Sequence, residues 1–566
     1  MSNTQYKLNI IHSDYTYFKL ETVEDPTICF DFYNKADMAK TLFHNDIVTY
    51  SNDQLSLVDR KPVILTGELE IYSKYILKSN TNSPCYIFRS IDNHYPKFMV
   101  TFGQKAKYGK NIIVRVENLT WCKTQSLPCA TILSVIGQID SLDCLLDSTI
   151  YARDLMPTYT KINKKTISDS FAKLLETESI KREKIELPII SIDPEGCRDI
   201  DDAFSYSETP TSFTLQIHIA DVYTVLSSLG YYNSFIQGKL QSSTIYLPTD
   251  KNYPMLPELF SSNICSLLEK QLKLMLTIEI KHNKCSGESM YRAFPSIGKI
   301  TRNYSYDNCP KDYVEIYGFL EKIYSYFTKQ RFHITDSHNM IECIMLTYNY
   351  LFGQINKNLA IYRIQDMGNQ QTIVTTDKDP ILSKFLQVIS SKSAIYSFKE
   401  SIHSSLNLTG YTHMTSPIRR LVDLIGQEIY YTGSSLFISK NPSILDSINS
   451  QSRSIKYLER DINKLKLAHM AYTSANNKYI THCYVYKVDI DKNKKYIYFP
   501  RENISIVDSI IHNSILESTS ITIENNCLLV YNDSVNQTIK LNSLVEAHLY
   551  GNPNLFNIDE SLLISF

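Results

Sequence analysis

The chain has 566 residues, of which 43% are hydrophobic and 21% are charged. These values exclude a largely disordered chain, and the length suggests about four domains of roughly 150 residues each. The 58 Lys and Arg residues nearly balance the 59 Asp and Glu residues, which leaves a formal net charge of -1. No global field therefore attracts a polyanion, and nucleic-acid binding would have to use local basic surfaces.

The cysteines and the N-terminus indicate where the protein is found. The 12 cysteines are scattered, and no two of them form a C-x-x-C pair, which excludes a zinc ribbon or a thioredoxin motif. The sequence begins without the basic flank and apolar run of a signal peptide, and no apolar stretch approaches the roughly 18 residues that span a bilayer. We expect a monomeric, intracellular protein without a membrane partner, with the cytoplasm preferred over the nucleus.

In chain order, short strand-like runs come first. Residues 1–60 and 61–155 each contain such runs between turn-forming residues, which is typical of small barrels. Residues 156–185 form a polar connector with a helix, whose lysines fit a solvated face better than an RNA contact. Residues 186–479 mix strands with longer helices, and residues 480–566 return to alternating strands. The longer helical patterns cover Asn339–Asn356, Pro417–Thr432 and Ser450–Tyr479. The sequence therefore predicts a multidomain α+β fold in which a large mixed α/β block follows two small β domains and precedes a third.

The most informative segment is acidic. In Pro188–Tyr206 an apolar, β-branched run delivers Asp193, and then Asp199, Asp201 and Asp202 follow as D-x5-D-x-D-D. Two carboxylates about 4 Å apart repel by on the order of 4 kcal/mol at an effective dielectric near 20, so cations between them would stabilise the loop. All-oxygen ligation is what Mg2+ prefers. Taken alone, the pattern is more often a solvated acidic turn, and its spacing does not fit an EF-hand calcium loop.

A second segment, Tyr411–Asp423, is predicted to begin a helix. Ser416 is a candidate N-cap and Pro417 suits the first helical position, which places Arg419 and Arg420 in the first turn. The helix dipole disfavours cations there, so two arginines make sense if an anion such as phosphate binds at that end. Surface arginines that pair with Asp423 and other acids are an equally good interpretation of this segment alone.

Together these two segments resemble the RNB family, the catalytic domain of ribonuclease II, ribonuclease R and the eukaryotic exosome nuclease. The pairing of IDPEGCRDIDDA with YTHMTSPIRR is the most specific feature. Other family-like segments lie between them in the family's order, namely IHIADV at Ile217–Val222, TIYLP with PMLP across Thr244–Pro257, ICSL at Ile264–Leu267, SYD at Ser305–Asp307 and SHNMIECIML at Ser337–Leu346. The N-terminal part is also similar to cold-shock barrels.

The resemblance implies an architecture and an activity. The fold would comprise two N-terminal OB or cold-shock-like barrels, the RNB catalytic domain and a C-terminal OB-like RNA-binding barrel. The activity would be processive 3′→5′ hydrolysis of single-stranded RNA to 5′-nucleoside monophosphates, with one or two Mg2+ ions that Mn2+ can replace. The rival interpretation is a catalytically silent RNA-binding or scaffold protein with this fold. Loss of the acidic residues would be its expected sign, and all four aspartates are present here.

The resemblance also assigns roles to residues. Asp193, Asp199, Asp201 and Asp202 match the family's metal cluster, and Asp201 matches the carboxylate whose loss stops cleavage while RNA stays bound. Arg419 matches the arginine at the scissile phosphate, and Arg420 matches its basic neighbour. This agrees with the physical argument, because bound metals activate water and a guanidinium fork neutralises charge on the phosphate.

Three further residues match positions at the buried 3′ end of the RNA. Tyr246 and Tyr306 match tyrosines that pack on bases and ribose, although any one of 41 tyrosines is often only a core residue. Glu342 matches a carboxylate near the terminal ribose, where a 2′-OH would distinguish RNA from DNA; otherwise it is a helix-surface residue. His218, His403 and His413 lack a ligand spacing and are expected to be structural.

Several positions depart from the family pattern. The stretch from Tyr306 to Ser337 is short, so a strand pair is expected to be missing there, with Phe332 the only nearby aromatic candidate. Cys343, Gln427 and Lys273 stand where the family usually has Glu, His and Arg. None of them touches the acidic cluster, so activity is still expected. The chain starts at the first barrel, so neither a PIN nuclease module nor tethering to an exosome is expected.

Overall fold

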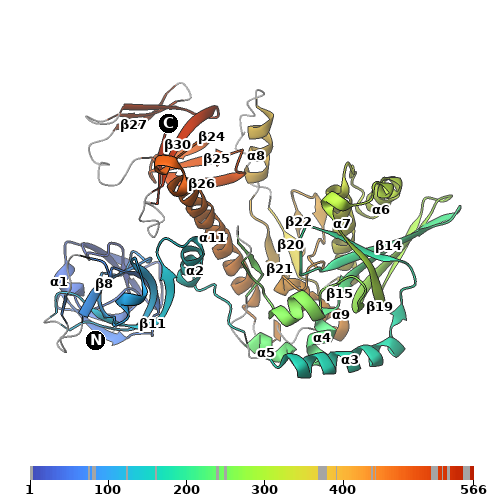
Figure 1. Cartoon of the computed structure of the whole chain (residues 1–566), viewed down its shortest axis with the longest axis horizontal. Helices are drawn as coiled ribbons and strands as arrows, with labels where there is room; N and C mark the ends of the chain where they lie inside the picture. The colour runs from blue at the N-terminus through green and yellow to red at the C-terminus, as the bar shows by residue number, and fades with distance from the viewer. Residues whose placement is uncertain are drawn as a thin grey trace. The chain divides into compact units, whose positions relative to one another are not determined.

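The computed structural model describes residues 4–566 apart from 74–76, 79–83, 123–124, 160–161, 238–240, 248–250, 358, 367–378, 391, 435–437, 440–441, 511–519, 525–526, 532–535 and 552–560. The chain forms two compact units, one made of Met1–Met156 with Lys456–Phe566 and the other of Pro157–Ile455. Figure 1 labels the main helices and strands of both. Among the described residues, no helix is both long and apolar enough to cross a membrane.

The first sheet owes its core to alternation along its strands. In β2 (Tyr17–Thr22) every second residue is buried, so Phe18 and Leu20 lie in the core while Tyr17 and Lys19 face outward. The strands pair in the order β3-β2-β1-β4-β5. Their bounds are β1 Gln5–Ile10, β3 Cys29–Tyr33, β4 Ile47–Ser51 and β5 Gln54–Asp59, and a short helix α1 covers Ala36–Ala39.

The second sheet is a closed barrel, because β6 pairs with both β10 and β8. Gly67 makes this closure possible, since a Cβ there would lie 2.2 Å from the carbonyl oxygen of Arg89. Helix α2 (Leu142–Ala152) follows the last strand, with its N-cap Ser141 accepting from the amide of Cys144. The strands are β6 Leu65–Leu69, β7 Leu77–Lys78, β8 Pro84–Ser90, β9 Phe98–Thr101, β10 Ile112–Thr120 and β11 Cys129–Gln138.

The C-terminal region is again β-rich. Its larger sheet has the order β26-β25-β24-β30-β31, and β27, β28 and β29 form a smaller one. Buried Lys464 of helix α11 (Ile444–Thr473) joins the helix to the larger sheet, because it pairs with Asp508 of β26 at 3.0 Å. Buried Lys495 of β25 pairs with the other oxygen of Asp508 at 3.3 Å, within the sheet. The strands are β24 Lys478–Asp489, β25 Lys494–Phe499, β26 Ile504–Ser509, β27 Ser520–Glu524, β28 Cys527–Tyr531, β29 Asn536–Lys540, β30 Leu544–Gly551 and β31 Leu562–Ser565.

The sheet of the second unit is also closed. Its order is β12-β19-β13-β14-β15-β18, and β18 pairs back onto β19. The register sets Asp202 opposite Ile219 and Asp193 beside Ser305. Strand β13 is fully apolar apart from Ser191 and Asp193, as expected for a strand covered on both faces. The strands are β12 Glu183–Lys184, β13 Ile189–Asp193, β14 Asp202–Glu208, β15 Ser212–Ala220, β18 Leu272–Asn283 and β19 Ser289–Ser305.

Helices cover this sheet from two sides. One core joins Ile189 and Met275 to α3, α4 and α9, and the other joins Phe204 and Leu276 to α6 and α7. The helices are α3 Lys164–Lys181, α4 Val222–Ser228, α5 Tyr232–Gln237, α6 Tyr317–Thr328, α7 Ser337–Ile355, α8 Pro380–Ser390 and α9 Leu421–Thr432. Short strands complete the unit: β16 Ile245–Tyr246, β17 Asn252–Tyr253, β20 Tyr362–Ile364, β21 Ile395–Ser397, β22 Ile402–His403 and β23 Leu408–Thr409.

The predicted multidomain α+β class is confirmed, with small β domains on either side of a large mixed block. The domain boundaries proposed from the sequence stay predictions. The predicted helix 450–479 is displaced, since α11 begins at Ile444 and ends at Thr473. It ends before the predicted residue because Asn476 and Asn477 adopt left-handed backbone conformations before β24. The described residues 306–336 form two 3-10 turns and α6 without a strand, as the short spacing predicted.

Candidate active site

The acidic residues lie at two adjacent strand ends and on the loop between them. Strand β13 ends at Asp193 and β14 begins at Asp202. Gly196 has φ +77° in the loop, a conformation that glycine adopts readily. Ile200 anchors the loop to the core, because its side chain is buried and its amide donates to the hydroxyl of Ser266 at 3.0 Å. The loop therefore turns back toward β13, and β14 pairs antiparallel with that strand.

Asp201 is the most firmly held of the four carboxylates. Its side chain is 2% exposed, and its Oδ1 accepts from the amide of Ile418 at 2.7 Å. Its Oδ2 lies 3.3 Å from Nε of Arg419. Burial raises the pKa of Asp201 well above its usual value, although Arg419 and the amide of Ile418 oppose that rise. Asp201 therefore joins the acidic loop to the arginine segment that lies 217 residues later in the chain.

The other carboxylates share this environment. Burial raises the pKa of Asp193 to about 6 and the pKa of Asp202 to about 7, and repulsion from neighbouring carboxylates adds to both shifts. Oδ2 of Asp193 and Oδ2 of Asp201 are buried without a hydrogen-bond partner among the described residues. Asp199 differs, because its Oδ2 accepts from the hydroxyl of Tyr246 at 2.6 Å.

The prediction that a helix starts at Pro417 is wrong. Residues 416–419 form a turn closed by the amide of Arg420 on the carbonyl of Ser416 at 2.9 Å, and α9 begins at Leu421. The cause is Asp423, whose buried carboxylate accepts from the amide of Ser416 at 2.7 Å. Instead of an open helix end, the turn directs the amide of Ile418 to Asp201.

The two arginines of this turn have different surroundings. Arg419 is 42% exposed and makes one ion pair, with Asp201, which leaves its other guanidinium nitrogens available to an anion. Arg420 donates to Asp423 at 2.7 Å and to Thr415 at 3.3 Å, and it lies 3.0 Å from Nδ1 of His413. Arg420 therefore packs into the fold, and its contact with RNA stays a prediction.

Tyr306 and Glu342 were the remaining predicted contacts. The ring of Tyr306 stacks on His338 at 3.7 Å between centroids, and its pKa is raised to about 12, first by burial and then by the charges of Asp202 and Asp193. Tyr306 therefore lies beside the acidic cluster. Glu342 is exposed on α7, and its contact with a ribose stays a prediction.

A cavity of about 250 Å³ opens next to Asp193. It is lined by the loop after β13 and by the end of β19, including Cys197, Arg302 and Tyr304. Burial and the charges of Asp193 and Asp199 raise the pKa of the Cys197 thiol to about 12, so it stays protonated near neutral pH.

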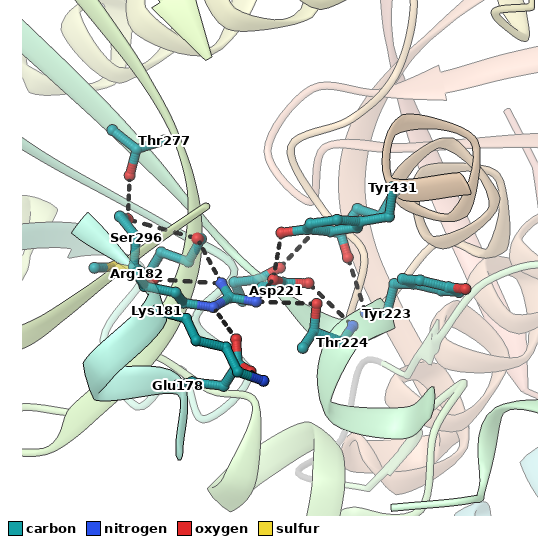
Figure 2. A network of polar contacts seen from close by, with 12 residues as sticks. Glu178, Lys181, Arg182, Asp221, Tyr223, Thr224, Thr277, Ser296 and Tyr431 are labelled. Carbon is teal, nitrogen blue, oxygen red and sulfur yellow. Dashed lines mark hydrogen bonds and ion pairs between the residues drawn. The ribbon is translucent and has the colours of Figure 1, made fainter. Parts of the chain in front are cut away.

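A buried ion-pair network in the same unit, which the sequence analysis missed, joins α3, α4 and α9 (Figure 2). Arg182 pairs with Asp221 at 2.7 Å and donates to Glu178 at 2.6 Å and to the hydroxyl of Thr224 at 3.1 Å. The hydroxyl of Tyr431 donates to the same Asp221 oxygen at 2.5 Å. Asp221 lay in the quoted IHIADV segment. Arg182 and Tyr431, which both contact Asp221, carry no local pattern that would have revealed these contacts.

His218 and His413 have side-chain hydrogen-bond contacts, as expected for structural residues, whereas Nδ1 of His403 is buried without a hydrogen bond among the described residues. His218 is fully buried and lies 2.6 Å from the hydroxyl of Ser205 and 2.8 Å from that of Thr277, and burial lowers its pKa to about 3. His413 lies 2.9 Å from the hydroxyl of Tyr396. His403 is buried and packs edge-on against Tyr411.

The comparison with known families agrees with this geometry. The family model described as "RNB domain" matches residues 182–315 and 321–433, which include all four aspartates, both arginines and the three predicted RNA contacts. This region of the chain matches an RNB domain. The resemblance noted in the sequence is thereby confirmed.

Curated relatives of this RNB protein are ribonucleases. The Ribonuclease R of Helicobacter pylori is 25% identical over 361 residues, which are 50% of this chain and 55% of that protein. The Ribonuclease R of Aquifex aeolicus is 21% identical over 545 residues, which are 77% of this chain and 75% of that protein. The chain spans about half the length of the first relatives it matches.

Solved structures share the fold over nearly the whole chain. The Mycoplasma genitalium RNase R in complex with ribose methylated single-stranded RNA has a TM-score of 0.71 at 16% identity, covering 99% of this chain and 100% of that one. Yeast Ssd1, described as a pseudonuclease, has a TM-score of 0.60 at 12% identity, covering 99% and 96%. The fold is thus shared by a ribonuclease and by a pseudonuclease, so the site residues must decide between the two functions.

The acidic residues fit a hard divalent cation by two criteria. The donors are all carboxylate oxygens, which suit Mg2+ or Mn2+. Two of these oxygens are buried without a hydrogen bond among the described residues, which a cation would correct. Within the same described part of the chain, no three acidic, His or Cys side chains are grouped closely enough to hold a metal as they stand. The fit therefore rests on donor chemistry and unsatisfied oxygens, not on a preformed coordination shell.

Proposed function

We propose that this RNB protein is a 3′→5′ exoribonuclease that hydrolyses single-stranded RNA processively to 5′-nucleoside monophosphates. One observation carries the proposal: Asp201 is buried beside Arg419, and the cluster around it keeps all four carboxylates, with two buried oxygens unsatisfied among the described residues. A protein that only binds RNA has no need for this unfavourable arrangement. The ribonuclease relatives support the same proposal.

Each residue would contribute a defined part. Nucleases of this family generally depend on a divalent metal, and we propose Mg2+, with Mn2+ as a substitute, held by Asp193, Asp199, Asp201 and Asp202. A bound cation activates an attacking water and stabilises charge on the phosphate. Arg419 would neutralise the charge that grows on the scissile phosphate, since its guanidinium is partly exposed.

RNA would be held mainly by stacking. The exposed ring of Tyr246 and the partly buried ring of Tyr306 would pack on bases, which tolerates any sequence. Glu342 would accept from a terminal 2′-OH and favour RNA over DNA. We also propose an intracellular location, which fits the 12 free cysteines.

The second candidate is a catalytically silent RNA-binding protein, which the likeness to the Ssd1 pseudonuclease favours. The two candidates differ in one assay. A 5′-labelled single-stranded RNA is incubated with Mg2+ and the full chain, beside Asp201→Asn and the control Glu195→Gln, which removes an exposed carboxylate from the same loop.

We expect the labelled RNA to shorten from its 3′ end to a short core with the wild type and with Glu195→Gln. Asp201→Asn should lower the rate by at least about a thousandfold while RNA binding remains. A wild type that binds the RNA and leaves it intact with both Mg2+ and Mn2+ would establish the silent candidate instead.

A further inference from the structure

The strand that carries Tyr246 is bonded directly to the arginine turn. The amide of Thr244 donates to the carbonyl of Arg419 at 3.0 Å, and the amide of Leu421 donates to the carbonyl of Ser242 at 3.0 Å. Strand β16 then places Tyr246 beyond this pairing, where it meets the acidic loop. Tyr246 and Arg419 therefore approach the aspartates from one backbone-bonded pair of segments.

The hydroxyl of Tyr246 makes a specific contact with one carboxylate. It donates to Oδ2 of Asp199 at 2.6 Å, a length typical of a hydroxyl on an ionised carboxylate. The Sγ of Cys197 lies 3.7 Å from the other oxygen of the same group. Asp199 thus has an oriented carboxylate, whereas Oδ2 of Asp193 and Oδ2 of Asp201 have no hydrogen-bond partner among the described residues.

The ring and the hydroxyl of Tyr246 have different surroundings. The side chain as a whole is 47% exposed, so a ring face is open to solvent while the hydroxyl points into the cluster. One side chain therefore offers two different groups to two different ligands.

We propose that Tyr246 is a positioning residue for the cation site: its hydroxyl orients Asp199 for metal binding while its ring receives a base. This deepens the proposed function and rests on it, because Asp199 is a ligand only if the cluster holds a cation. Groups that orient a metal-binding side chain typically change metal affinity by about 10–100-fold when removed. RNA seated on the ring would hold the hydroxyl on Asp199, so substrate binding and cation binding would favour each other.

The test separates the hydroxyl from the ring. Binding of Mn2+ to the full chain without RNA is titrated by electron paramagnetic resonance for the wild type, Tyr246→Phe and Tyr159→Phe. Tyr159 is a matched control, because it is 42% exposed and its hydroxyl donates to the carbonyl of Pro254 at 2.5 Å, close to β17 and away from the acidic residues.

We expect Tyr246→Phe to weaken Mn2+ binding about tenfold and Tyr159→Phe to leave it within about twofold. RNA affinity in EDTA should stay within about twofold for Tyr246→Phe and fall about tenfold for Tyr246→Ala, which loses the ring. At low RNA concentration, a higher Mg2+ concentration should restore cleavage by Tyr246→Phe. It should not restore cleavage by Tyr246→Ala, because that variant has also lost the ring that binds RNA.

The outcomes distinguish the two proposals. Equal Mn2+ affinity in the wild type and Tyr246→Phe overturns the positioning role even if cleavage is normal. An equal loss in Tyr159→Phe also overturns it, because the effect would then not depend on Asp199. A wild type that neither binds Mn2+ nor cleaves RNA overturns both proposals. A wild type that binds Mn2+ without cleaving overturns only the proposed activity, and the Tyr246→Phe titration still decides the positioning role.

Discussion

Two buried groups of charges in the same unit are built in opposite ways. In the Arg182–Asp221 network every charged atom shown has a partner: the guanidinium meets two carboxylates, a hydroxyl and two strand carbonyls, and Asp221 accepts from an amide and a tyrosine (Figure 2). In the aspartate cluster four carboxylates face a single nearby ion-pair partner, Arg419, and two buried oxygens are left without a hydrogen bond among the described residues.

The difference teaches how to tell a structural charge group from a functional one. A balanced network has already recovered the cost of removing its charges from water, so it needs nothing from outside the chain. An unbalanced cluster is unfavourable until a ligand of opposite charge arrives. The Arg182 network therefore holds α3, α4 and α9 on the sheet, whereas the aspartate cluster keeps two buried oxygens without a hydrogen bond among the described residues.

The largest effect is expected from breaking the balanced network. Arg182→Met should lower the free energy of unfolding by about 3–5 kcal/mol, because Asp221 would stay buried without its cation. Thermal or urea unfolding followed by circular dichroism measures the loss. Arg292→Met is the control: Arg292 also meets two carboxylates, but its side chain is 50% exposed, so less than about 1 kcal/mol should be lost. Equal losses in the two variants would mean that burial does not set the difference.

The next effect concerns Arg419, which is ion-paired with Asp201 of the unbalanced cluster. Arg419→Lys should lower the rate of RNA cleavage by about a hundredfold, because Lys cannot offer two nitrogens to one phosphate. Its melting temperature should change little, since Arg419 is partly exposed and makes one ion pair at 3.3 Å. Single-turnover cleavage at saturating RNA measures the rate. A variant that cleaves normally, or one that loses stability as Arg182→Met does, would place Arg419 in the structural class.

The smallest effect tests the imbalance without any ligand. The pKa of Asp193 is raised to about 6 by burial, above its value in the unfolded chain, so the folded protein holds this proton more tightly. Its contribution to stability is therefore present in acid and is lost as the pH rises through about 6. In EDTA, the free energy of unfolding of the wild type should fall between pH 4 and pH 8. In Asp193→Asn this fall should be smaller by about 1–2 kcal/mol.

The measurement is the urea midpoint at the two pH values. Asp169→Asn, a change of an exposed aspartate on α3, should leave the wild-type pH dependence as it is. If Asp193→Asn behaves like this control, the carboxylate repulsion inferred here is absent in solution.

The acidic cluster was the part of the site that the sequence could predict, because its residues are close in the chain. Asp193 to Asp202 span ten positions, and an apolar strand before them fixes where the first carboxylate lies. The start of α9 was not predictable in the same way. Ser416 and Pro417 have the chemistry of a helix start, but Asp423 captures the amide of Ser416 and the pairing of Arg420 with Ser243 keeps that residue extended. Tertiary contacts decided against a good local signal.

The Arg182 network shows the other limit. Its members come from three helices, α3, α4 and α9, and two strands, β18 and β19, and a lone arginine after a lysine-rich helix looks like any solvated residue. Only the closed sheet brings these residues together. The contact between Tyr246 and Asp199 was likewise beyond local reasoning, although both residues were chosen individually for other reasons.

The closure through β18 and β19 of the sheet that carries the aspartates also bears on its motions. An open sheet has edge strands, and local unfolding can begin at those strands. In this sheet β18 pairs back onto β19, so the closed ring of described strands has no free edge at which such unfolding could begin. Strands β13 and β14, which bear Asp193 and Asp202, have neighbours on both sides within that ring. We therefore expect the amides of β13 and β14 to exchange with solvent mainly when a larger part of the ring opens at once, and the edge that carries the aspartates to exchange slowly.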